Sequence, residues 1–202
     1  MTGARIGVLG GTFDPVHNGH LAIASSLREA LDLERVVWVP AGQPPHKQGQ
    51  IVSSDADRLA MLELAVAGSP VDAISRVDLD RGGPSYTADL LEILHRQFAP
   101  NTLVFLMGED SLRDLPAWHD PERIIRLAEL AVAARPGIET DLDAIERQIP
   151  TARGRIFLAP TPEISISSSD IRRRVRDGEP IDTLVPPAVA RYIADHGLYR
   201  SD

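Results

Sequence analysis

Apolar runs of strand length recur along the chain, separated by more polar segments. They lie at 6–9, 36–39, 73–79, 103–107, 130–134 and 156–159. Because these runs are short and nearly continuous, they are typical of strands buried on both faces of a parallel sheet. Apolar residues at helical spacing fill most of the gaps between them. We therefore predict a doubly wound α/β sheet with right-handed crossovers.

The predicted helices begin and end at residues that favour helix termini. Asn18 and Ser85 each precede an apolar pattern of helical spacing, and their side-chain oxygens can accept hydrogen bonds from the free N–H groups of a first turn. Further helices are predicted at 57–66, 121–127, 141–148 and 186–196, the last of them followed by Gly197. We interpret 1–202 as one domain, in which about 180–202 form a small helical C-terminal extension.

The composition narrows the class of protein. With 202 residues, 43% hydrophobic and 25% charged, the chain can bury the core of a compact domain. It contains no cysteine, which excludes disulfides, thiolate metal sites and a cysteine nucleophile. No apolar run approaches the roughly 20 residues of a membrane span, and the N-terminus lacks a signal-peptide pattern. We therefore expect a cytoplasmic protein without a membrane partner.

The charge balance limits the partners further. The 29 acidic and 21 basic residues give a net charge of −8. This sign opposes binding to the phosphates of a long polynucleotide, so no nucleic acid is expected as a partner. A small anionic substrate stays open, because a binding site needs only a few cations in the right place.

The segment after the first predicted strand, GGTFDPVHNGH (10–20), carries the first candidate chemistry. Gly10 and Gly11 let backbone N–H groups approach a ligand that side chains would exclude. His17 and His20 stand at the start of the next helix, where free N–H groups and the helix dipole favour an anion. We interpret the segment as a phosphate site. Purely structural histidines or a metal pair stay open, although no cysteine or H-E-x-x-H pattern supplies further metal ligands.

A second candidate anion site follows the last predicted strand, in ISSSDIRRR (166–174). Its three serines can cap a helix and donate hydroxyl groups to a ligand. Arg172 and Arg176 lie four residues apart, so their guanidinium groups share one helix face. Together these features favour a polyphosphate, while an ordinary capped helix with a solvated basic face stays open.

These two segments resemble the paired signature of the nucleotidylyltransferase superfamily, (H/T)xGH and ISSTxIR. Position 169 is Ser where that pattern often has Thr, which keeps the hydroxyl group. The rest of the chain resembles the bacterial nicotinate mononucleotide adenylyltransferases, in the same order, at PPHK (44–47), SYT (85–87), MGEDSL (107–112), LPAWHDP (115–121), RPG (135–137) and YIADHGLY (192–199). The likeness covers essentially the whole chain and implies a Rossmann-like nucleotidylyltransferase fold.

The resemblance implies roles around the phosphates of ATP. His17 and His20 would contact them, with His20 stabilising the transition state. Thr12 and Phe13 would line the turn around the reacting phosphate. Lys47 would neutralise phosphate charge from a Pro- and Gly-rich loop, where a lysine can otherwise be merely solvated.

Further ATP contacts are implied elsewhere in the chain. Ser168 and Arg172 would hold the triphosphate, and Arg135 would lie near the adenine nucleotide. Gly108 and Asp110 would bind the ribose, since a carboxylate can accept both sugar hydroxyls. A helix cap is the alternative role for Asp110.

The resemblance also implies a site for the second substrate. Trp118 would stack on a pyridine ring, while Tyr86, Thr87 and the backbone at His119 would bond the nicotinate carboxylate. On its chemistry alone, Trp118 can equally be a core residue. Trp38 lies within an apolar strand, and we predict that it belongs to the core.

The reaction implied by the resemblance joins ATP and nicotinate mononucleotide. The 5′-phosphate attacks the α-phosphorus in line, giving nicotinate adenine dinucleotide and pyrophosphate without a covalent intermediate. Positioning and electrostatic stabilisation suffice for this chemistry. Mg²⁺ is expected as the cofactor, delivered with ATP, so no protein metal site is required.

Several alternatives stay open at this point. Sibling transferases use other acceptors, such as nicotinamide mononucleotide, phosphopantetheine or glycerol phosphate. The HNGH segment is also comparable with the HIGH motif of class I aminoacyl-tRNA synthetases, but the chain is short, acidic and without a KMSKS-like loop. A nucleotide sensor without catalysis is a further reading. The oligomeric state, a homo-oligomer included, is not determined by the sequence.

Overall fold

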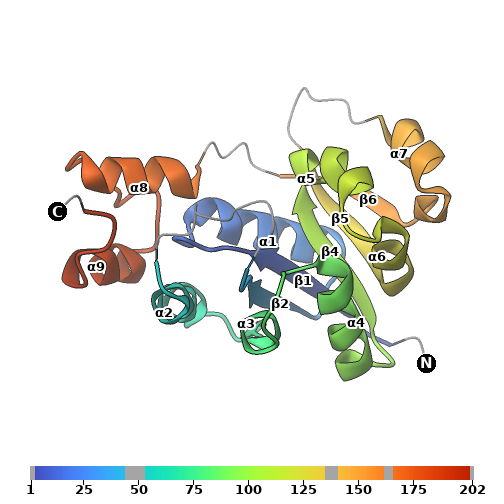
Figure 1. Ribbon diagram of the computed structural model, residues 1–202, viewed down its shortest axis with the longest axis horizontal. Coiled ribbons are helices and arrows are strands. Elements are labelled where there is room, and N and C mark those ends of the chain that lie inside the picture. Colours follow the sequence, from blue (N-terminus) through green and yellow to red (C-terminus); the bar gives the residue numbers. More distant parts are fainter. Residues whose placement is uncertain (1–2, 44–52, 135–140, 162–165, 201–202) are drawn as a thin grey trace.

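The described part of the chain forms a parallel sheet with helices on both faces (Figure 1). The computed structural model describes residues 3–43, 53–134, 141–161 and 166–200. The strands are β1 (Arg5–Gly11), β2 (Arg35–Pro40), β3 (Asp72–Ile74), β4 (Thr102–Gly108), β5 (Ala128–Ala134) and β6 (Ile156–Pro160). Their order across the sheet is β3-β2-β1-β4-β5-β6, and every neighbouring pair is parallel. The predicted doubly wound α/β fold is confirmed.

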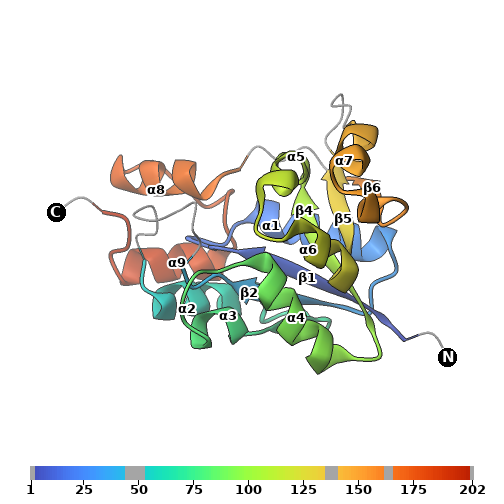
Figure 2. The same cartoon turned by 45° about the vertical axis from the view of Figure 1, so that its right-hand side comes forward.

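Helices follow the strands along the chain. They are α1 (Asn18–Ala30), α2 (Asp55–Val66), α3 (Val77–Asp80), α4 (Thr87–Phe98), α5 (Glu109–Asp114), α6 (Pro121–Leu127), α7 (Leu142–Gln148), α8 (Ser168–Arg176) and α9 (Pro187–Asp195). Residues of α1, α2, α8 and α9 pack in the core cluster on one face of the sheet, and residues of α4 to α7 pack in the cluster on the other. Figures 1 and 2 show α8 and α9 together at one end of the molecule, away from the N-terminus. No helix in the described part has the length and apolar character that a membrane span requires.

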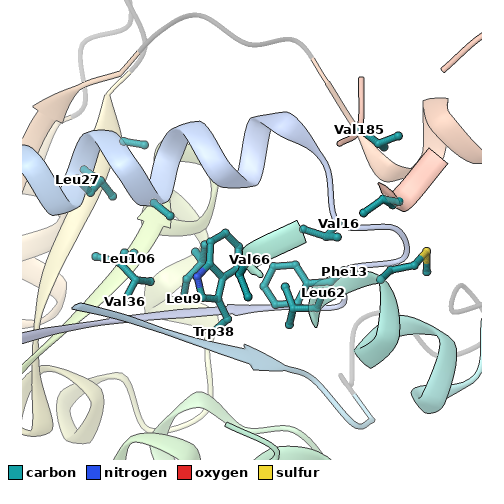
Figure 3. Packing of buried hydrophobic residues seen from close by; sticks show 14 of the residues in the cluster. Leu9, Phe13, Val16, Leu27, Val36, Trp38, Leu62, Val66, Leu106 and Val185 are labelled. Atoms are coloured by element: carbon teal, nitrogen blue, oxygen red, sulfur yellow. The ribbon is translucent and has the colours of Figure 1, made fainter. Parts of the chain in front are cut away.

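The two core clusters arise from the alternation of side chains along each strand. In β4, Val104 and Leu106 lie in the cluster beneath α1, while Leu103, Phe105 and Met107 lie in the opposite one. Both sets must be apolar because helices cover both faces, which explains the continuous apolar run. Figure 3 shows part of the first cluster, in which Trp38 is buried as predicted.

The prediction of a strand over 73–79 is wrong beyond its first residues. Pairing with β2 ends at Ile74, and the chain then turns into the short helix α3. The turn brings the buried Asp78 carboxylate to Gly42 N, which donates to it over 3.0 Å, and to Arg81 Nε at 2.7 Å. A straight edge strand could not form these bonds, and they are not encoded in local hydrophobicity.

Two predicted helix caps are also wrong. His17, not Asn18, caps α1, and the Asn18 amide instead donates to Thr183 O over 3.0 Å. Tyr86 stands at the N-cap of α4 without a side-chain capping bond, while the Ser85 hydroxyl accepts from Gln43 N at 2.8 Å. Both polar side chains are used for contacts with distant segments, which outweigh the local capping preference.

The alternation in β4 predicts a strong difference between two Leu→Ala substitutions. Leu106 is 1% exposed, and Leu106→Ala should lower the free energy of unfolding by about 2–5 kcal/mol, because it leaves a cavity under α1. Leu64 on α2, at 39% exposure, should cost less than about 1 kcal/mol. Urea unfolding of both variants measures the difference, and equal losses would contradict the assignment of the core.

Candidate active site

The candidate site lies where the strand order reverses, at the carboxyl ends of β1 and β4. In open α/β sheets the crevice at this point is where ligands bind. β1 ends at Gly11 and leads directly into the loop 12–17, which joins it to α1. At Gly11 a Cβ atom would lie 2.8 Å from the Phe13 ring, so the turn has no room for a side chain. Gly11 is thus required by the turn itself, and the predicted approach of backbone N–H groups to a ligand stays a prediction.

His17 and His20 form a reciprocal capping box at the start of α1. His20 N donates to His17 Nδ1 over 3.3 Å, and His17 N donates to His20 Nδ1 over 3.2 Å. The two rings stack with centroids 3.6 Å apart. An Nδ1 that accepts a hydrogen bond carries no proton, so the proton of each ring lies on Nε2. Each imidazole can therefore donate one N–H bond from Nε2.

The electrostatic state of His17 follows from its burial. Desolvation lowers the pKa of this imidazole to about 4, opposed only by its backbone hydrogen bond. The ring is therefore neutral at pH 7 and can bind an anion as a hydrogen-bond donor rather than as a cation.

The Phe13 side chain packs against the histidine pair through His20. Its ring is buried and lies edge-on to His20, with centroids 5.1 Å apart. The centroid of the Trp38 ring lies 5.6 Å from that of Phe13, and Figure 3 shows both side chains in the core cluster. Only the backbone of Phe13 can therefore line the turn around a phosphate. The backbone here has a positive φ of 51°, an uncommon value for a residue with a side chain.

The second motif reaches the first in space, as the sequence predicted. Ser167 caps α8, and the Ser168 hydroxyl donates to Pro15 O over 2.9 Å. Arg172, one turn further, donates from one terminal nitrogen to Asp14 O over 2.7 Å. Segments more than 150 residues apart thus lie in contact. The predicted meeting of the two motifs is confirmed, and their joint binding of a triphosphate stays a prediction.

Most of the predicted acceptor residues line one small cavity. Its volume is about 190 Å³. It is lined by Gly10, Gly11, Thr12, Val39, Ala41, Asp78, Ser85, Tyr86, Thr87, Leu90, Phe105 and Trp118. This mixture of apolar side chains and hydroxyl groups suits a flat ring with a polar substituent.

Aromatic contacts shape the mouth of this acceptor cavity. The half-buried Trp118 packs edge-on against Phe105, with centroids 6.2 Å apart, so it belongs partly to the core and partly to the cavity wall. His119 is exposed and stacks on Tyr86 at 4.3 Å. The side chain of His119 therefore orients Tyr86, a contact that the sequence did not indicate.

Gly108 and Asp110 lie at the carboxyl end of β4, beside the first motif. Gly108 is the N-cap of α5. Asp110 lies in the first turn of this helix, is exposed and forms an ion pair with Arg113. Asp110 is therefore not the helix cap. The predicted residues Lys47 and Arg135 lie outside the described residues.

A larger cavity, with a volume of about 760 Å³, is lined by residues of α8 and α9. Arg176 of the second motif is among them, but none of the residues to which the resemblance assigns a role lines this cavity. Within the described ranges there is also no group of three or more His, Asp or Glu residues placed to hold a metal ion.

Known proteins resemble the chain over this same region. The profile of the family described as cytidylyltransferase-like matches residues 8–174, from β1 into α8. A protein of Thermomicrobium roseum named "probable nicotinate-nucleotide adenylyltransferase" is 57% identical over 98% of this chain and 92% of its own length. A protein of the same name from a Roseiflexus species is 47% identical over 99% of this chain and its own full length.

The chain belongs to the nicotinate-nucleotide adenylyltransferase family. It is thus a nucleotidyltransferase enzyme of NAD biosynthesis. Solved structures agree with the fold of this family: the Plasmodium falciparum nicotinic acid mononucleotide adenylyltransferase, complexed with APC or with NaAD, aligns with TM-scores of 0.76 and 0.77. Each alignment covers 97% of both chains at 21% and 20% identity.

Within the adenylyltransferase site, sequence reasoning missed Arg58. This α2 side chain is 0% exposed and donates to Thr12 O over 2.7 Å and to Asp55 Oδ1 over 2.6 Å. In the sequence it is one charged residue of an amphipathic helix, with no signal of burial. Its partner carbonyl stands 46 positions earlier, so only the fold reveals the contact.

The neutral state of His17 predicts a pH-dependent stability. Its pKa of about 4 lies below the ordinary 6.5, so the unfolded chain binds this proton first as the pH falls. The free energy of unfolding should therefore fall by about 3 kcal/mol as the pH is lowered from 6.5 to 4, because the unfolded chain binds the His17 proton more tightly. His17→Asn keeps a capping acceptor and does not titrate. Denaturant unfolding at several pH values should show that the free energy of unfolding falls more steeply with acid in the wild type than in His17→Asn. The same pH dependence in both proteins would contradict the neutral state of His17.

Proposed function

We propose that this cleft transfers the adenylyl group of ATP to nicotinate mononucleotide. One observation carries the assignment of the residues: Gly10, Gly11 and Thr12 line the acceptor cavity and lead directly into the histidine pair. A nucleotide phosphate at the histidines and a pyridine nucleotide in the cavity would therefore meet at this turn. Such proximity is the main requirement of a reaction between two bound anions.

The proposed step is a single in-line displacement. An oxygen of the 5′-phosphate of nicotinate mononucleotide forms a bond to the α-phosphorus of ATP. The bond from this phosphorus to the oxygen that bridges it to the β-phosphate breaks, and pyrophosphate leaves with that electron pair. The acceptor phosphate is already ionised at neutral pH, so no general base is required.

The residues of the cleft would supply electrostatic stabilisation. His17 and His20 would donate from Nε2 to phosphate oxygens on which negative charge grows. Arg172 would supply a positive charge at the N-terminus of α8, where Ser168 and free N–H groups also stand. In this proposal Lys47 adds a second cation and Arg135 contacts the adenine nucleotide. Mg²⁺ would arrive as part of the substrate Mg·ATP.

The remaining residues would orient the two nucleosides. The exposed Asp110 carboxylate can accept both ribose hydroxyls if it exchanges Arg113 for them. In the cavity, Trp118 would stack on the pyridine ring, and Tyr86 and Thr87 would bond its carboxylate together with the backbone at His119. Because its substrate ATP is held in the cytoplasm, we place the reaction there.

An acceptor panel tests the proposed reaction. The protein is incubated with Mg·ATP and one acceptor: nicotinate mononucleotide, nicotinamide mononucleotide or phosphopantetheine. We expect dinucleotide and pyrophosphate with nicotinate mononucleotide at a kcat/KM at least tenfold above the others, about 1.4 kcal/mol of discrimination. Equal turnover of nicotinamide mononucleotide would contradict the proposed bonds from Tyr86, Thr87 and the backbone at His119 to the nicotinate carboxylate. Turnover of phosphopantetheine alone would contradict the whole proposal.

His20→Ala should affect catalysis more than binding. If the Nε2 bond strengthens as charge grows on the phosphate, its loss should lower kcat by about 100-fold while the Kd for ATP changes only a few-fold. The exposed His95 on α4 provides a matched control, since His95→Ala should leave kcat unchanged. Steady-state kinetics and calorimetric ATP binding measure both quantities. A rise in Kd equal to the fall in kcat/KM would instead indicate simple ground-state binding.

A further inference from the structure

Arg58 is a charged side chain that is buried against the loop 12–17. Its side chain has no exposed surface. One terminal nitrogen donates to Thr12 O over 2.7 Å, and the other donates to Asp55 Oδ1 over 2.6 Å. Its Nε atom has no hydrogen-bond partner in the described part of the chain. Burial of a cation with an unsatisfied N–H group is unfavourable, so the stability of the fold does not by itself explain an arginine at this position.

The ion pair with Asp55 does not explain the burial either. The Asp55 side chain is 61% exposed in the first turn of α2, where water and the free N–H groups of the helix already stabilise a carboxylate. Asp55 therefore does not need a buried cation. The bond to Thr12 O is different, because its acceptor belongs to the loop that joins β1 to the histidine pair.

The bond to Thr12 O fixes the direction of the next backbone N–H group. Thr12 and Phe13 are joined by a trans peptide, in which C=O and N–H point in opposite directions. Thr12 O points to Arg58, so Phe13 N–H points away from it. This N–H forms no hydrogen bond to any described residue, although Phe13 is only 1% exposed. A buried donor that the protein leaves unpaired is suited to a ligand.

The backbone of Phe13 depends on the same contact. Its φ of 51° is uncommon for a residue with a side chain, so surrounding contacts must hold it. A return to negative φ would turn the peptide plane that carries Thr12 O and would break the bond to Arg58. The buried guanidinium therefore opposes a relaxation of the loop that would also redirect Phe13 N–H.

We propose that Arg58 is a positioning residue, whose hydrogen bond to Thr12 O aims Phe13 N–H at a phosphate group in the active site. Arg58 has no exposed surface, so it touches no substrate and acts only through the loop. The inference rests on the proposed function, because it takes the turn after β1 as the place where the phosphates meet. A misdirected N–H would stabilise the charge that grows during the transfer less well, which lowers kcat more than it weakens substrate binding.

The test compares Arg58→Met, Arg58→Lys and Val66→Ala with the wild type. Methionine is flexible and carries no charge, whereas lysine keeps a cation that can donate to Thr12 O from a different position. Val66 is buried about two turns further along α2, so Val66→Ala perturbs the packing of the same helix and leaves the Arg58 bond in place. All variants are assayed well below their measured unfolding temperatures.

We expect R58M to lower kcat by about 30-fold and R58K by about fivefold, while the KM of each substrate changes less than about threefold. V66A should keep kcat within about twofold of the wild-type value, because it acts on packing away from the loop. Mg·ATP or nicotinate mononucleotide, each added alone, should shift the amide NMR signal of Phe13 in the wild type. This shift should be smaller in R58K and smallest in R58M.

Unchanged kcat in folded R58M, or a change confined to KM, would overturn the inference. A V66A variant that loses as much activity as R58M at the same fall in unfolding temperature would also overturn it. If R58M does not fold, R58K decides, since wild-type kcat and a wild-type Phe13 shift in R58K would contradict the role of Arg58. A wild type that transfers no adenylyl group, but whose Phe13 signal responds to a nucleotide and loses this response in R58M, would contradict only the proposed reaction.

Discussion

The candidate site depends on hydrogen bonds to the backbone carbonyls of the loop between β1 and α1. Thr12, Asp14 and Pro15 accept from Arg58, Arg172 and Ser168 respectively. Most of this loop is buried, and buried carbonyls without a donor would be costly. The donors come from α2 and α8, which the core holds in place, so these two helices help to fix the shape of the loop. The loop in turn determines where His17 and His20 lie.

Apolar packing explains why these donors stay in position. Val16 in the loop and Val185 before α9 are both fully buried in the cluster that also holds Ile171 of α8 and residues of α1 and α2 (Figure 3). Two further bonds run from Asn18, to Thr183 O and Leu184 O. The C-terminal part of the chain therefore supports the site. Its apolar residues pack in the same cluster as Val16, and Tyr199, which follows α9, donates to Asp14 in the loop 12–17. A local opening of this part would release the polar contacts of the loop together with its apolar cover.

The proposed reaction uses neutral hydrogen-bond donors beside a few charged side chains. His17 stays neutral because the same burial that fixes its ring also disfavours its charge. The overall charge of −8 is no obstacle, since the cations that matter are local. A rigid pair of Nε2 donors and a guanidinium at a helix N-terminus can bind a polyphosphate without a protein metal site. Magnesium that travels with ATP would complete the neutralisation.

The sequence by itself determined the central strands, the parallel class of the sheet and the two motifs that meet in space, because hydrophobic period, glycine and helix-start residues act over a few neighbours. It also indicated Trp38 as core. It could not determine where β3 ends, which residue caps α1, or that Arg58 is buried, since Asp78, Asn18 and Arg58 meet partners that the chain brings near only on folding. Only the tertiary structure decided that Asp14 stands between Arg172 and Tyr199. Long-range hydrogen bonds between buried groups leave no local pattern, because each partner looks ordinary among its own neighbours.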